Sequence, residues 1–252
     1  MQLYFIRHAQ STNNALWDIT GSSQGRSEDP AISETGCQQA ERLAQFFAQK
    51  MDPGERLTPA PEGSATPIYN GDLQNRTGIH LTHLYTSLML RAVMTSTIVA
   101  RATGLPLVAW KDLHECGGIY LDDEMTGLPV GLPGKNRSYF EQNFPALRLP
   151  DDLDEKGWWN RPFESVDERT LRAKRFLEDL LKRHGGTHHR VGVVSHGAFY
   201  NRLLRELMHM SSHEGLWFMM NNCAVTRIDF NEDQVGLVYT NRADFLPADL
   251  IT

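Results

Sequence analysis

The chain opens with MQLYFIRHAQSTNN (residues 1–14), in which an apolar run ends on an arginine followed by a histidine. The apolar residues 3–6, flanked by polar ones, predict a short buried strand. A buried strand rarely ends on two adjacent basic side chains unless they have a use. We therefore expect an anionic group to meet Arg7 and His8.

The composition is that of an ordinary globular chain of 252 residues, 40% hydrophobic and 22% charged. We predict a single domain over residues 1–252. A net charge of −6 argues against a nucleic-acid partner, because binding a phosphate backbone requires a broad basic face. Any anion site must therefore be local.

The cysteines and the apolar segments indicate in which cellular compartment the protein is expected. Cys37, Cys116 and Cys223 show no CxxC spacing, so we predict free thiols in a reducing compartment. No segment reaches the roughly 18 apolar residues that a membrane span needs, and the N-terminus lacks a secretory pattern. We expect a cytoplasmic protein with no membrane partner. The oligomeric state stays open, with a homodimer as one alternative.

The order of patterns along the chain predicts strands that alternate with helices. A polar loop at about residues 11–30 precedes an amphipathic helix capped by Ser33, and strand–helix pairs recur at residues 80–104 and 190–210. This alternation implies a mostly parallel sheet covered on both faces, a three-layer α/β/α sandwich. Two stretches break the rhythm: a loop excursion at about 52–78 and a cap-like insertion at about 117–162.

Chemistry-bearing residues gather where the predicted strands end, and ligands of open α/β sheets bind outside the carboxyl ends of the strands. Four strand ends or the turns after them contribute such side chains: Arg7 and His8, Ser87 and Arg91, His114 and Glu115, and Ser195 and His196. Each residue alone could be structural, but the set points to one shared site.

The set suits phosphoryl transfer. Two guanidinium groups neutralise a phosphate dianion and hold its oxygens. A neutral imidazole then attacks to give a phosphohistidine, and a second, protonated histidine donates to the phosphate oxygens. A carboxyl group protonates the leaving oxygen. His8, His196 and Glu115 fit these three roles.

Five motifs in order resemble the histidine phosphatase superfamily, the phosphoglycerate mutase-like family, over most of the chain. They are RHAQSTNN, DPAISETGCQQA, SLMLRAVMTSTIVA, LHEC and VVSHGAFYNRLL. The resemblance implies the family's fold and assigns the nucleophile His8, the proton donor Glu115, and phosphate contacts from Arg7, Asn14, Arg91 and His196.

The departures from the family pattern favour hydrolysis over transfer. Ala9 replaces the usual glycine, and Gln10 and Asn13 stand where the glycolytic mutases typically carry Glu and Trp. We expect a metal-independent phosphatase that needs no cofactor. A phosphoglycerate mutase-type phosphomutase is the alternative, and a non-catalytic protein that binds phosphorylated ligands is a third reading.

The insertion begins at the catalytic rim and is expected to shape the substrate pocket for a small phosphorylated metabolite. Candidate pocket residues are Gln10, Tyr120, Arg137 and Trp158. In the alternative reading, the insertion's aromatic residues form a small core of its own.

A metal enzyme is a different class of reading, because two histidines and a carboxylate can bind zinc or iron. Arg7 and Arg91 argue against it at the rim, since a divalent cation beside two guanidinium groups is electrostatically costly. The pairs His80/His83 and His188/His189 lack a third partner at a suitable spacing, so we interpret them as surface residues.

Overall fold

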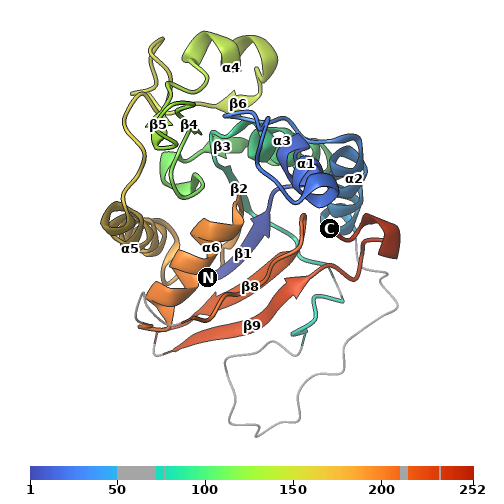
Figure 1. Ribbon diagram of the computed structural model, residues 1–252. Helices are drawn as coiled ribbons and strands as arrows, with labels where there is room; N and C mark the ends of the chain where they lie inside the picture. Colours follow the sequence, from blue (N-terminus) through green and yellow to red (C-terminus); the bar gives the residue numbers. More distant parts are fainter. Residues whose placement is uncertain (50–71, 77, 211–214, 233) are drawn as a thin grey trace, which may run out of the picture.

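The computed structural model describes residues 1–49, 72–76, 78–210, 215–232 and 234–252. Most of the excursion expected at 52–78 lies outside these residues. A seven-stranded sheet forms the centre of the molecule, in the order β6-β3-β2-β7-β1-β8-β9 (Figure 1).

Five strands of this sheet run parallel to one another, and the two at one edge each pair antiparallel with the strand before them in the sheet. The parallel strands are β1 (Gln2–Arg7), β2 (His83–Thr86), β3 (Leu107–Ala109), β6 (Leu147–Arg148) and β7 (Arg190–Ser195). The antiparallel strands are β8 (Val225–Phe230) and β9 (Val235–Arg242). β1 and β7 are buried along nearly their whole length, as their near-continuous apolar sequence requires.

Helices cover both faces of the sheet. α2 (Glu34–Ala48) and α3 (Leu90–Thr103) pack together on one face, and α5 (Val166–His184) and α6 (Gly197–Leu207) on the other (Figure 1). The predicted three-layer α/β/α sandwich is therefore confirmed. None of the helices in the described part of the chain is both long and apolar enough to cross a membrane.

Helix caps explain where two of these helices begin. The Ser33 side chain accepts a hydrogen bond from Gly36 N and starts α2. Ser165 and Glu168 form a reciprocal capping box at the start of α5. The start of α2 agrees with the sequence prediction.

The polar loop expected at about residues 11–30 contains a helix, α1 (Thr12–Thr20). Ser11 and Asn14 form its capping box, and Gly21 ends it in the left-handed conformation at φ 63°. α1 has no fully buried residue, so the apolar period that reveals a helix in a sequence is missing.

The insertion at 117–162 contains a two-stranded hairpin, a short helix and one strand of the main sheet. These are β4 (Tyr120–Asp122), β5 (Pro129–Gly131), α4 (Arg137–Asn143) and β6, which pairs with β3. Phe140, Trp158 and Trp159 are buried, so much of its aromatic content fills a core. One-turn helices at Lys111–Leu113 and Ala248–Leu250 complete the described elements.

A buried ion pair fixes the insertion's far end to the sheet edge. Arg172 of α5 is 1% exposed and donates to Glu164 through Nε and Nη2, at 2.6 and 2.8 Å. Its Nη1 donates to the carbonyls of Asp112 and His114 at 2.7 and 2.8 Å. Arg172 thereby holds the segment that leads to Glu115.

Arg172→Met is expected to lower the free energy of unfolding by about 3–5 kcal/mol, because it leaves the Glu164 charge buried without its partner. Denaturant unfolding measures the loss. The control is Arg175→Met, which removes a half-exposed arginine that pairs with Asp112 and should cost less than about 1 kcal/mol. Equal losses in the two variants would contradict this assignment.

Candidate active site

The carboxyl ends of β1, β2 and β7 meet at one edge of the sheet. Arg7 and Ser195 are paired in register, and His8 N donates to Ser195 O at 2.9 Å. A cavity of about 350 Å³ opens there, and its lining includes Arg7, His8, Arg91 and Glu115. His196 lies beside His8, with ring centroids 5.0 Å apart. The structure thus brings the predicted chemistry-bearing residues together.

The His8 ring is held with the lone pair of Nε2 facing Arg91. Its Nδ1 lies 2.7 Å from the carbonyl oxygen of Ala9, an acceptor, so Nδ1 carries the hydrogen. The lone pair on Nε2 accepts from Arg91 Nε at 3.1 Å. Burial, followed by the charges of Arg91 and Arg7, lowers the pKa of His8 well below its ordinary value. The ring is therefore neutral at physiological pH, with its lone pair on Nε2.

His196 lies at the start of α6 and is fully buried. Its Nε2 is 2.9 Å from Ser87 Oγ, while Nδ1 is buried without a hydrogen-bond partner in the described part of the chain. Burial, followed by Arg91 and His8, lowers the pKa of this ring well below its ordinary value. A neutral His196 still offers one N–H, and the protonated form expected from the sequence requires the negative charge of a phosphate beside it.

Arg91 and Arg7 both lie close enough to His8 for their charges to act on its ring. Arg7 donates through Nη1 to the carbonyl of Met220, and its buried Nε lacks a partner among the described residues. Arg91 Nη1 lies 4.0 Å from Asp29 Oδ1. Burial raises the pKa of Asp29 to about 6, against the opposing effect of Arg91. Both guanidinium groups are thus anchored at one end and lie beside the nucleophile.

Glu115 is held at the first turn of α6. Its Oε1 accepts from Cys116 N at 2.8 Å and Phe199 N at 3.0 Å, and Oε2 accepts from Ala198 N at 3.2 Å. Oε1 thus accepts two of these hydrogen bonds and Oε2 accepts one. The helix N-terminus fixes the carboxyl group at the cavity wall.

Asn14 and Tyr120 also line the cavity. Asn14 caps α1, where its Oδ1 accepts from Ser11 N and Oγ at 3.1 and 2.9 Å. Asn222 Nδ2 donates to the carbonyl of His8 at 2.9 Å. The loop that carries the nucleophile is therefore fixed by amide side chains from both ends of the chain.

The other three pocket candidates lie outside the cavity lining. Gln10 is buried between Ser33 and Asp18, to which its side chain is hydrogen-bonded at 2.6 and 3.0 Å. Arg137 donates to the backbone carbonyls of residues 150 and 153. Trp158 is buried, with its ring centroid 5.7 Å from that of His114. Arg137 and Trp158 therefore contact the insertion and the segment before it, and Gln10 links α1 to the start of α2.

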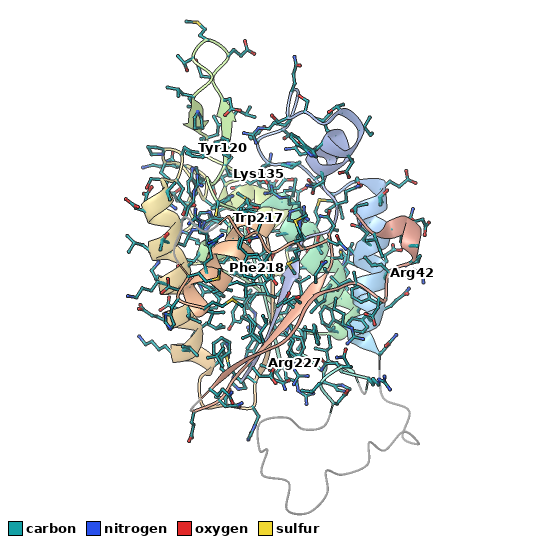
Figure 2. All side chains as sticks on the ribbon, turned by 60° about the horizontal axis from the view of Figure 1, so that its bottom comes forward. Arg42, Tyr120, Lys135, Trp217, Phe218 and Arg227 are labelled. Carbon is teal, nitrogen blue, oxygen red and sulfur yellow. The ribbon has the colours of Figure 1, made fainter. Side chains whose placement is uncertain are left out.

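Sequence reasoning missed several residues that line the cavity, among them Arg26, Trp217, Phe218 and Met219. The guanidinium of Arg26 lies 4.2 Å from the ring centroid of Tyr120, and its Nη2 donates to the Tyr120 carbonyl at 2.9 Å. Figure 2 shows Trp217 and Phe218 between the ends of the central strands and Tyr120. All four lie in segments without apolar periodicity, so no pattern in the sequence marks them.

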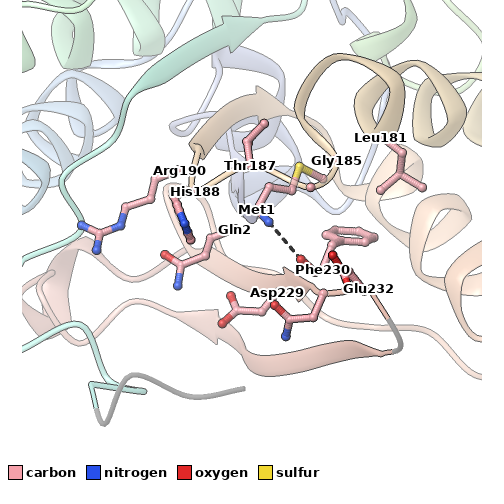
Figure 3. Close-up of a pocket in the computed structure, with 12 residues that line it drawn as sticks. Met1, Gln2, Leu181, Gly185, Thr187, His188, Arg190, Asp229, Phe230 and Glu232 are labelled. Atoms are coloured by element: carbon pink, nitrogen blue, oxygen red, sulfur yellow. Dashed lines mark hydrogen bonds between the residues drawn. The ribbon is translucent and has the colours of Figure 1, made fainter. Parts of the chain in front are cut away.

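A slightly larger cavity, about 380 Å³, lies at the opposite edge of the sheet (Figure 3). Among the described residues that line it, Arg190 is the one arginine, and its neighbours include Asp229 and Glu232. This cavity lacks the paired arginines beside a histidine that a phosphate site requires.

Comparison with known proteins agrees with the geometry. The model of the histidine phosphatase superfamily (branch 1) matches residues 3–55 and 73–243. A search of curated proteins finds no significant match.

Two solved structures share the fold over nearly their whole length. Phosphoserine phosphatase from Entamoeba histolytica, solved in complex with 3-phosphoglyceric acid, is 20% identical; the match covers 98% of this chain and 99% of that one, with a TM-score of 0.56. Mycobacterial glucosyl-3-phosphoglycerate phosphatase is 17% identical, with coverage of 96% and 99% and a TM-score of 0.55. With the family model matching most of its length, the chain belongs to the histidine phosphatase superfamily.

Proposed function

We propose that this protein hydrolyses the phosphomonoester of a small metabolite through a phosphohistidine on His8. The observation that carries the proposal is a histidine with an unprotonated ring nitrogen beside two arginines and a second histidine. His8 Nε2 carries a lone pair because Nδ1 is tied to Ala9 O, and Arg7 Nε and His196 Nδ1 are buried without partners in the part of the chain described. A phosphate group supplies the acceptors that these donors need.

The first half-reaction follows from this arrangement. Arg7 and Arg91 hold the phosphate dianion, and the Arg91 bond to His8 is exchanged for bonds to phosphate oxygens. His8 Nε2 attacks phosphorus, the bond from phosphorus to the ester oxygen breaks, and Glu115 gives its proton to that oxygen. The alcohol leaves, and the phosphoryl group stays on His8.

Water completes the cycle. The Glu115 carboxylate accepts a proton from water as the water oxygen attacks phosphorus, and the P–N bond breaks to return neutral His8 and inorganic phosphate. Throughout, the guanidinium groups and His196 stabilise charge on the phosphate oxygens.

The cavity beyond the phosphate favours a small leaving group with polar and apolar parts. Tyr120, Trp217 and Phe218 supply aromatic surface, and Arg26 supplies a positive charge. The Entamoeba histolytica relative was solved with 3-phosphoglyceric acid, so phosphorylated carboxylic acids form the first panel of substrates to test.

Phosphate release from such a panel, in the presence of EDTA, is expected to vanish in His8→Asn, which removes the nucleophile but keeps a side chain of similar size. Glu115→Gln should lower kcat/KM for alkyl phosphates about 100-fold or more, yet lower kcat/KM for p-nitrophenyl phosphate much less, because kcat/KM reports on formation of the phosphohistidine and that leaving group needs no proton.

Isomerisation of 3-phosphoglycerate without phosphate release would make the protein a mutase instead. Undiminished release by His8→Asn would contradict the proposal, and so would an equal loss of kcat/KM for both leaving groups in Glu115→Gln.

In the pH profile of kcat/KM, we expect the fall on the acid side to occur at a pH below the ordinary pKa of histidine. The reactive form of His8 is neutral, and its pKa is lowered by burial and the two arginines, so a fall in pH from 7 to about 6 does not protonate it. The profile is measured against the concentration of substrate dianion, which removes the substrate's own ionisation. An acid limb with an apparent pKa at or above about 6.5 would show that the ring titrates normally.

Arg26→Gln should raise KM about tenfold, equivalent to about 1.4 kcal/mol, for substrates with a second anionic group, and little for those without one. Steady-state kinetics on a matched pair of monophosphates, with and without a carboxylate, measures the difference. Arg137→Gln is the comparison variant, because Arg137 binds backbone carbonyls outside the cavity and should not discriminate between the two. Discrimination by Arg137 and not by Arg26 would overturn the assignment.

A further inference from the structure

Three histidines converge at the amino ends of the parallel strands, the end of the sheet opposite the phosphate site. His83 begins β2, His184 ends α5, and His189 directly precedes β7. β2 and β7 are adjacent parallel strands, so their starting residues lie side by side. The interpretation of His83 and His189 as surface residues without a third partner is therefore wrong. The third partner is His184, which lies at the end of a helix and has no recognisable metal-binding spacing from the other two in the sequence.

The three rings are close enough to share one ion. One ligand nitrogen from each lies within 4.8 Å of the other two. His184 Nδ1 and His189 Nδ1 are 2.9 Å apart, and the ring centroids of His83 and His189 are 4.4 Å apart. Zinc–nitrogen bonds of about 2.0–2.1 Å place two ligand nitrogens of a tetrahedral site roughly 3.4 Å apart. Small rotations of the rings reach this geometry.

Neighbouring hydroxyl groups orient two of the rings. The buried Tyr85 hydroxyl lies 3.1 Å from His184 Nε2, and Thr82 Oγ1 lies 2.8 Å from His83 Nδ1. These contacts leave His184 Nδ1 and His83 Nε2 to face the centre of the cluster. Metal-binding histidines are commonly oriented in this way through their second nitrogen.

Burial and the neighbouring rings favour the neutral form of His184. Burial, followed by the neighbouring His83 and His189, lowers the pKa of His184 to about 4. Arg183, the nearest cation on α5, is stacked on Trp110, with its guanidinium carbon 4.0 Å from the ring centroid. Neutral imidazole is the form that binds metal ions.

We infer that His83, His184 and His189 form a binding site for a divalent transition-metal ion, with Zn²⁺ as the reference ion. Imidazole ligands without a carboxylate suit Zn²⁺, Cu²⁺ or Ni²⁺ and not Mg²⁺ or Ca²⁺. His184 is buried and the other two are half-buried, so a water molecule can complete the coordination. The ion ties the end of α5 to the starts of β2 and β7, and it takes no part in phosphoryl transfer.

Titration of the full, EDTA-stripped chain with Zn²⁺ by calorimetry tests the site. Wild type is expected to bind one Zn²⁺ per chain, and His83→Gln and His189→Gln should each weaken binding by at least about tenfold. The matched control is His188→Gln. His188 is next to His189 in the chain but lines the separate cavity of Figure 3, so this variant should keep wild-type affinity. His8→Asn should keep it too, which separates this site from the phosphate site.

A second readout is thermal stability. Excess Zn²⁺ should raise the Tm of wild type and of His188→Gln but not of the two cluster variants. No Zn²⁺ binding by wild type overturns the inference, as does unchanged binding in His189→Gln or loss of binding in His8→Asn. If a cluster variant does not fold, the imidazole NMR signals of wild type provide the test. Zn²⁺ is expected to shift the signals of three histidine rings. Shifts confined to the histidines of the phosphate site would contradict the inference.

Discussion

The parallel pairing of β1 with β7 is the constraint on which the active site depends. The register places Arg7 opposite Ser195, so the two strands end level and the next residues, His8 and His196, meet with ring centroids 5.0 Å apart. Because side chains alternate across a strand, a slip of one residue would turn these groups to the opposite face. Sheet register, set by buried apolar residues, thus determines catalytic geometry.

Polar contacts then fix what the register brings together. The Ala9 carbonyl selects the His8 tautomer, the first turn of α6 holds Glu115, and Arg172 anchors the segment before it through two backbone carbonyls. Such buried groups are costly unless they are paired, so each pair also excludes alternative positions of the loop. The chemistry rests on this arrangement, because attack and proton transfer both require fixed distances.

Sequence patterns predicted the sandwich and the meeting of the strand-end residues at one cavity, and they failed where no periodic or topological rule applies. Strand ends share one edge of a parallel sheet, so Arg7 and Glu115 could be placed together from the sequence. Arg26 and Trp217 lie in irregular segments, and their meeting at the cavity depends on tertiary packing. Trp158 illustrates the reverse error, since an aromatic residue in an insertion fills a core as readily as a pocket.

The central claim is that His8 carries the phosphoryl group, and trapping that intermediate tests it most directly. Mixing the protein with substrate, quenching within the first turnover and mapping the phosphorylated peptide would locate the label. The account predicts a phosphoryl group on His8 that is stable to alkali, labile to acid, and absent from His8→Asn. Phosphate release without any phosphoenzyme in wild type, or a label on another residue, would contradict it.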